Sequence, residues 1–131
     1  MTTSIVTVTP DMDILEASRS LVNHGISGAP VVDELGNLVG ILTERDCFKI
    51  TLNAGYFEEL GGKVSEFMSR DVEIVTPEMS VLDLAELFLR TRYRRYPVVV
   101  DNRLVGLISR RDVLKALLDL SWDSSPSEKG M

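Results

Sequence analysis

The chain contains two similar nine-residue stretches, LVGILTERD at residues 38–46 and LVGLISRRD at residues 104–112. These stretches stand 66 residues apart, and upstream of them identical residues recur at a spacing of 67, namely Met1, Val8, Thr9, Pro10, Met12, Leu15, Pro30, Val31 and Val32 with their partners in the second half. A one-residue deletion between matching blocks is how a hairpin turn varies between two copies of one motif. The sequence therefore predicts a tandem duplication.

Each copy reads as strand, helix, β-hairpin and helix, from its alternating and helical spacing of apolar residues. The first copy is predicted to form these elements over residues 5–9, 14–24, 26–42 and 44–53. The second copy is predicted to form them over residues 73–76, 81–90, 96–108 and 110–120. Asp13 and Ser80 stand at the helix starts as capping residues. A tight turn at Asp101 and Asn102 accounts for the missing residue.

We expect an α+β fold in which two β-α-β-β-α motifs, related by a pseudo-twofold axis, pack sheet to sheet with their helices outside. With 131 residues, 44% of them hydrophobic, the chain can bury a shared core. The expected segments are a first motif at 1–54, a linker at 55–67 with a helical turn near its end, a second motif at 68–120 and a flexible tail at 121–131. Two equivalent clefts should form where the three-stranded sheets meet.

Positive charge is concentrated in one stretch of this acidic chain, whose net charge is −6. Residues 90–111 carry +6 and the remainder −12, because one acid, Asp101, stands among seven arginines: Arg90, Arg92, Arg94, Arg95, Arg103, Arg110 and Arg111. Such a cluster indicates either a local anion site or a solvated basic face. The overall acidity disfavours RNA or DNA as the main partner.

Several classes of protein are disfavoured by what the sequence lacks. It has no apolar run long enough for a membrane span and no signal-peptide pattern, and its single cysteine, Cys47, suits a reducing compartment, so we expect a cytoplasmic protein away from membranes. One histidine, His24, and no Gly-rich phosphate loop leave little for catalysis or metal binding. We expect no enzyme, no catalytic residue and no metal site.

A hydroxyl residue and an aspartate three positions later end both copies of the repeated stretch, as Thr43 with Asp46 and as Ser109 with Asp112. Because each pair follows a buried strand and opens a helix, free N–H groups there would attract phosphate, the aspartate would accept hydrogen bonds from a ribose, and the intervening Arg45 or Arg111 would reach an anion. The same spacing is typical of ordinary helix caps. The residues alone leave both interpretations open.

The paired copies resemble CBS domains, the tandem modules named after cystathionine β-synthase, and together they resemble a Bateman module. The resemblance covers residues 1–120 and rests on APVVD at 29–33 and YPVVV at 96–100, each followed by the repeated stretch, and on the lead-in VSEFM at 64–68. It implies binding of AMP, ADP or ATP, with S-adenosylmethionine or NAD-like molecules as alternatives.

Carried across by motif, the resemblance implies a role for each matching residue. Asp46 and Asp112 would hold ribose hydroxyls, and Thr43 and Ser109 would touch phosphate or ribose. The residues just before each strand proline would contact base or phosphate, which are Ser27, Gly28 and Ala29 in the first copy and Arg94, Arg95 and Tyr96 in the second; Thr9 and Thr76 would approach from the opposite copy. The cleft with Arg94, Arg95 and Arg111 should prefer more phosphate charge than the one near Ser27 and Gly28.

The sequence thus predicts a stand-alone regulatory module that senses energy state through an adenosine ligand bound between two CBS motifs. Apolar residues left outside on the helices would make it a homodimer of flat discs that acts on an unidentified effector protein. The alternatives are a dimerisation scaffold with empty clefts, whose hydroxyl–aspartate pairs only cap helices, and nucleic-acid binding through residues 90–111.

Overall fold

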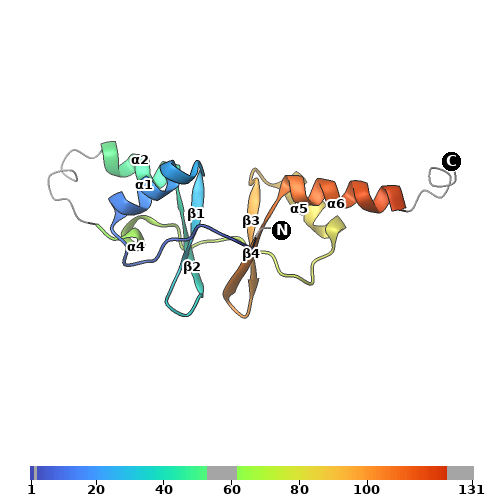
Figure 1. Ribbon diagram of the computed structural model, residues 1–131, viewed down its shortest axis with the longest axis horizontal. Coiled ribbons are helices and arrows are strands. Elements are labelled where there is room, and N and C mark those ends of the chain that lie inside the picture. Colours follow the sequence, from blue (N-terminus) through green and yellow to red (C-terminus); the bar gives the residue numbers. More distant parts are fainter. Residues whose placement is uncertain (2, 53–61, 124–131) are drawn as a thin grey trace.

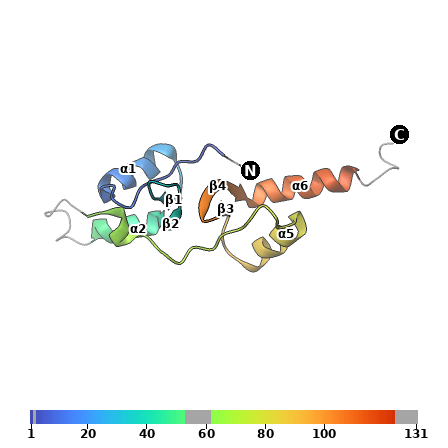
Figure 2. The same ribbon diagram turned by 90° about the horizontal axis from the view of Figure 1, so that it is seen from below.

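The computed structural model of the chain describes residue 1, residues 3–52 and residues 62–123. These residues form two lobes in which the β-hairpins face each other and the helices lie on the outer sides (Figures 1 and 2). The first lobe holds α1 (Ile14–His24), β1 (Gly28–Val32), β2 (Leu38–Thr43), α2 (Glu44–Leu52) and the short α4 (Val64–Phe67). The second holds α5 (Val81–Arg90), β3 (Arg95–Val100), β4 (Arg103–Ser109) and α6 (Arg110–Asp123). The α+β fold of two repeated motifs is confirmed.

The two hairpins differ only at their turns. Strand β1 pairs antiparallel with β2, and β3 pairs antiparallel with β4. In the first turn one carboxylate oxygen of Asp33 accepts the N–H groups of Leu35 and Asn37, both at 2.9 Å. In the second turn Asp101 and Asn102 adopt φ values of 49° and 69°. Positive φ at both central residues is the geometry of a two-residue hairpin, which explains the deletion in the second copy.

The third strand predicted in each half is reduced to one bridged residue. Val8 lies parallel to β1, donating to the Pro30 carbonyl at 3.1 Å and accepting from the Val32 N–H at 2.9 Å. The next bond of a parallel ladder would need an N–H on Pro30, which proline lacks. Val75 stands in the same relation to β3, where Pro97 ends the ladder. The chain before Val8 therefore leaves the sheet and runs between the lobes.

The lobes hold each other by exchanging the segments that lead into them. Met68, at the start of the second copy, packs on Gly40 of the first, and Met1 of the first copy packs on Gly106 of the second. A methyl group added at Gly40 would lie 2.7 Å from the sulfur of Met68, and one added at Gly106 would lie 2.6 Å from that of Met1. Each repeated stretch thus has a glycine where a methionine packs closely on the backbone.

Backbone hydrogen bonds complete this connection. Ser69 and Ile41 exchange two bonds of 2.9 Å, which pair the second lead-in with the outer edge of β2. At the hairpin turns, the Leu38 N–H donates to the Asn102 carbonyl at 2.9 Å and the Leu104 N–H donates to the Gly36 carbonyl at 3.1 Å. Side-chain packing adds less than expected, since the buried apolar residues form two clusters, one in each lobe, and the prediction of a shared core was wrong.

The helix starts are stabilised in two different ways. At α5 the predicted capping box is present, with the Asp83 N–H donating to Ser80 Oγ at 3.1 Å and the Ser80 N–H donating to Asp83 Oδ2 at 3.2 Å. At α1 the Asp13 side chain makes no capping bond, and the Ile14 N–H donates instead to the Gly62 carbonyl at 2.9 Å.

None of the helices among the described residues has both the length and the apolar character of a membrane span. The flexible tail predicted from residue 121 falls mostly outside the described residues.

Candidate functional site

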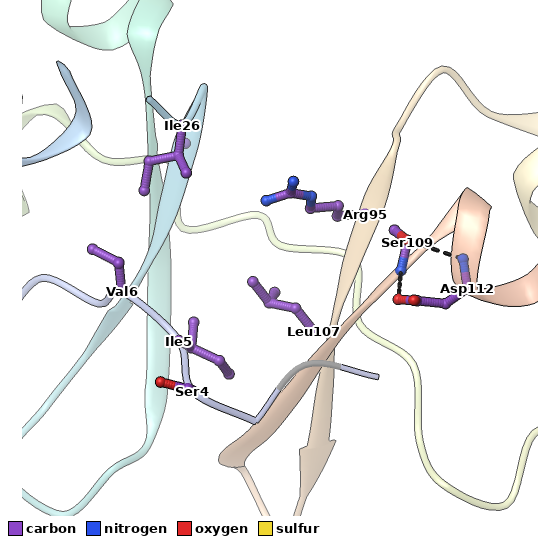
Figure 3. Close-up of a pocket in the computed structure, with 9 residues that line it drawn as sticks. Ser4, Ile5, Val6, Ile26, Arg95, Leu107, Ser109 and Asp112 are labelled. Atoms are coloured by element: carbon purple, nitrogen blue, oxygen red, sulfur yellow. Dashed lines mark hydrogen bonds between the residues drawn. The ribbon is translucent and has the colours of Figure 1, made fainter. Parts of the chain in front are cut away.

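A cavity of about 280 Å³ lies between the lobes. We call it the Ser109 cavity, and its lining residues come from both copies: Ser4, Ile5, Val6, Ile26, Gly28, Arg95, Leu107, Ser109 and Asp112 (Figure 3). The first lobe contributes the segment that has left the sheet and the start of β1. The second lobe contributes the start of β3, the end of β4 and the first turn of α6.

Charged and apolar side chains both line the Ser109 cavity, and the second lobe supplies both kinds. The Arg95 side chain reaches from β3 toward Ile26 of the first lobe, and Leu107 points into the same space from β4 (Figure 3). Ser109 and Asp112 sit at its far wall, where β4 passes into α6. Arg95 faces Ser109 across the β3–β4 pair because these two residues are partners in the strand register. The cavity therefore offers a guanidinium and a carboxylate within one hollow.

Ser109 and Asp112 form a reciprocal pair at the start of α6. The Ser109 N–H donates to Asp112 Oδ2 at 2.9 Å, and the Asp112 N–H donates to Ser109 Oγ at 3.1 Å. The backbone hydrogen bond from Ser109 lowers the pKa of Asp112 below its ordinary value of 3.8, against the opposing effect of burial, and the Arg95 charge lowers it further. Asp112 is therefore a carboxylate, an acceptor only, at neutral pH.

Thr43 and Asp46 make the matching pair at the start of α2, but this pair is more enclosed. Asp46 Oδ2 accepts both the Thr43 N–H and the Thr43 hydroxyl at 2.9 Å, and Lys49 Nζ lies 3.6 Å from Asp46 Oδ1. Asp46 is 8% exposed. Both pairs thus make helix-cap bonds, and the Ser109 pair in addition lines the cavity.

The structure brings four of the sequence-predicted site residues together around the Ser109 cavity: Gly28, Arg95, Ser109 and Asp112. This combination differs from the expected one, which put Gly28 and Arg95 in separate clefts, because the start of β1 faces the end of β4. Ala29 and Tyr96 are buried in the lobe cores. Six other predicted site residues are exposed and do not line this cavity: Thr9, Ser27, Arg45, Thr76, Arg94 and Arg111.

The apolar wall of the cavity is made by Ile5, Val6, Ile26 and Leu107, and neither these residues nor Ser4 were predicted as site residues from the sequence. The alternation of apolar and polar residues at 5–9 predicts a strand, which would place the side chains of Ile5 and Val6 on the faces of a sheet. Pro30 could have indicated that these residues lie outside the sheet, because a proline in the neighbouring strand ends a parallel ladder before it reaches Val6.

The cavity can bind a small molecule with one anionic group, a polar group that donates hydrogen bonds, and an apolar part. Arg95 would hold a phosphate or carboxylate, Asp112 would accept from hydroxyl groups, and the apolar wall would take up a flat ring. Among the described residues, no group of three or more His, Cys, Asp or Glu side chains is arranged to hold a metal ion.

A family model described as "CBS domain" matches two segments of the chain, residues 1–53 and 64–119. The CBS domain-containing protein YhcV of Bacillus subtilis is 36% identical over 127 residues, covering 97% of this chain and 87% of that protein. An uncharacterized 17.7 kDa protein of Acidianus ambivalens is 33% identical over 120 residues, covering 91% of this chain and 71% of the relative.

Two longer relatives come from Methanocaldococcus jannaschii. The uncharacterized protein MJ1225 is 32% identical over 130 residues, and this chain spans 45% of its length. Inosine-5'-monophosphate dehydrogenase is 38% identical over 112 residues, but this chain spans only 21% of that enzyme.

Solved structures with the same fold include two that hold adenosine compounds. CBSX2 in complex with AMP superposes with a TM-score of 0.76 at 29% identity, covering 90% of each chain, and CBSX2 is a CBS-pair protein from Arabidopsis thaliana. The CBS domain pair of MJ0100, in complex with 5-methylthioadenosine and S-adenosyl-L-methionine, superposes with a TM-score of 0.67 at 29% identity, covering 86% of this chain and 87% of that one.

Proposed function

Since this chain belongs to the CBS-domain family, we propose that it is a regulatory module that binds an adenosine-containing ligand in the Ser109 cavity. One observation carries the proposal: the cavity combines a guanidinium, a carboxylate of lowered pKa and an apolar wall at the junction of the two copies. Support also comes from the similar CBS pairs whose structures hold AMP, or 5-methylthioadenosine and S-adenosyl-L-methionine.

Each part of an adenosine nucleotide has a matching part of the cavity. An ionised carboxylate has about four acceptor positions, of which the Ser109 N–H uses one, so Asp112 can accept from both hydroxyls of a ribose. Arg95 would bind the phosphate through two parallel N–H donors. Ile26 and Leu107 would cover the faces of the adenine ring.

Size and charge favour a short nucleotide. At about 280 Å³ the cavity is slightly smaller than the range for ligand pockets, roughly 300–1,000 Å³. Of the arginines in residues 90–111, Arg95 alone is among its lining residues. We therefore place AMP ahead of ADP and ATP, with S-adenosylmethionine and NAD-like molecules as the alternatives.

Thermal unfolding in the presence of AMP, ATP and S-adenosylmethionine tests the proposal. A ligand at 100 times its Kd adds about 2.7 kcal/mol to the free energy of unfolding, which for a chain of this length raises Tm by about 10 °C. Asp112→Asn should remove most of that shift, whereas Asp119→Asn, an exposed acid on the same helix, should keep it. No shift with any of the three compounds would favour the ligand-free scaffold.

Exposed apolar side chains on the outer helices support a homodimer as the working form. The same two positions are exposed and apolar in both copies: Val22 and Leu89 are 78% and 87% exposed, and Phe48 and Leu114 are 64% and 57% exposed. Because α1 packs with α2, and α5 with α6, each lobe presents two of these side chains on its outer helices. A second copy of the chain would bury them.

Light scattering tests the homodimer. The wild-type chain should have twice the mass of a monomer, and Leu89→Glu with Leu114→Glu should halve it. Leu35→Glu is the matched control, since Leu35 is 68% exposed but lies in a hairpin turn away from the helices. A monomeric wild-type chain would refute this part of the proposal.

A further inference from the structure

Six of the nine residues that line the Ser109 cavity have counterparts in the other copy that line a second, much smaller cavity. Its volume is about 40 Å³, and we call it the Tyr93 cavity. The repeat places Asp71, Glu73, Tyr93 and Arg95 there, at the positions that Ser4, Val6, Ile26 and Gly28 hold in the first. Its space suffices for a few water molecules, whereas the Ser109 cavity is seven times larger.

Bulky side chains fill the Tyr93 cavity and are held in place. The rings of Tyr93 and Tyr96 meet edge to face with their centroids 5.6 Å apart. The Tyr96 hydroxyl donates to Thr91 Oγ1 at 2.7 Å and lies 3.4 Å from Glu73 Oε2. Tyr96 is 1% exposed, so its ring belongs to the core of the second lobe and a ligand could not displace it cheaply.

The two cavities differ in the charge of their lining residues as well as in volume. The Tyr93 cavity has two acids, Asp71 and Glu73, where the Ser109 cavity has the neutral Ser4 and Val6. A phosphate placed there would stand beside both carboxylates, and like charges repel. Arg95 lines both cavities, so its single positive charge is shared between the acids on one side and the open cavity on the other.

The hydroxyl–aspartate pair is also missing from the smaller cavity. Thr43 and Asp46 would be its counterparts of Ser109 and Asp112, but neither is among the residues that line it. Asp46 Oδ2 is occupied by two donors from Thr43, and Lys49 stands beside Oδ1. The Tyr93 cavity thus lacks the helix-start carboxylate that Asp112 supplies in the Ser109 cavity.

We infer that each chain binds one adenosine ligand, in the Ser109 cavity, and that the Tyr93 cavity stays closed although the repeat makes it the formal equivalent. Four exchanges between the copies set this asymmetry: Ser4 against Asp71, Val6 against Glu73, Ile26 against Tyr93, and Gly28 against Arg95. The inference rests on the proposed function and adds its stoichiometry of one ligand per chain.

Isothermal titration of the full chain with AMP tests the inference. The expected stoichiometry is one AMP per chain. Leu107→Trp, which fills the Ser109 cavity, should weaken binding at least 100-fold or abolish it, and Asp112→Asn should weaken it at least tenfold. Tyr93→Ala is the matched control in the other cavity, where Tyr93 is 54% exposed, and it should leave one site with a Kd within about twofold of wild type. A melting curve of each variant confirms folding.

The outcomes separate the inference from the function on which it rests. Two AMP molecules per chain, or one that Leu107→Trp does not weaken while Tyr93→Ala does, would overturn the inference and leave an adenosine-binding module. No heat with AMP, ATP or S-adenosylmethionine would overturn the proposed function, and the inference with it.

Discussion

The glycine in each repeated stretch offers a paired test of how the two copies hold each other. Gly40→Ala would place a methyl group 2.7 Å from the Met68 sulfur and 2.8 Å from the Ser69 carbonyl oxygen. Neither atom can move freely, because Met68 is 9% exposed and the Ser69 carbonyl accepts the Ile41 N–H at 2.9 Å. Overpacking of this kind costs about 1–3 kcal/mol.

The matching substitution Gly106→Ala meets a softer neighbour. Its methyl group would approach only side-chain atoms of Met1, at 2.6, 2.8 and 3.1 Å, and Met1 is 59% exposed and can swing away. Replacing glycine by alanine also stabilises the folded state by about 0.4–1 kcal/mol, since the unfolded chain loses freedom. We expect a net loss of about 1–2 kcal/mol for Gly40→Ala and a net change near zero for Gly106→Ala.

Calorimetric or dichroism melting curves give the comparison directly. At about 4 °C per kcal/mol for a chain of this length, Gly40→Ala should lower Tm by about 4–8 °C and Gly106→Ala by less than about 2 °C. Equal Tm values for the two variants, or a larger loss at Gly106, would show that the exchanged lead-ins do not hold the lobes as described.

Three further perturbations follow from single contacts. Ser80→Ala removes the capping box of α5 and should cost about 1 kcal/mol in a urea titration; no change in the midpoint would count against the cap. Tyr96→Phe removes the hydroxyl that donates to Thr91 at 2.7 Å, and should lower stability by about 1 kcal/mol without changing AMP affinity. The folded-state pKa of Asp112 lies below 3.8, so its ionised form stabilises the fold above that pH and the contribution is lost as pH falls further. Asp112→Asn should therefore melt with a shallower loss of Tm below pH 4 than wild type, and parallel curves would contradict this.

The repeat made most of the fold predictable. Helix and hairpin bounds followed from apolar spacing, and the Asp101–Asn102 turn followed from a one-residue difference in register. The third strands were overestimated because apolar alternation before Val8 says nothing about the missing N–H of Pro30 in the neighbouring strand. Separate lobe cores could not be foreseen either, since composition counts apolar residues without showing which of them meet.

The sequence motif of the site was predictable, but the side chains of the opposite copy that complete it were less so. The hydroxyl–aspartate spacing located Ser109 and Asp112, but the same spacing at Thr43 and Asp46 gives an enclosed cap. Which of the two pairs faces an open cavity depends on side chains from the opposite copy. Gly28 leaves space in the Ser109 cavity, whereas Arg95 takes the equivalent position in the Tyr93 cavity. That pairing is a matter of how the lobes meet, and local sequence patterns do not encode it.

A crystal structure of the chain grown with AMP would show where the nucleotide binds and how many are bound. We expect one nucleotide per chain, with ribose hydroxyls within hydrogen-bond distance of Asp112, the phosphate on Arg95, and no nucleotide beside Tyr93. Nucleotide density beside Tyr93 and Asp46, with the Ser109 cavity empty, would contradict it.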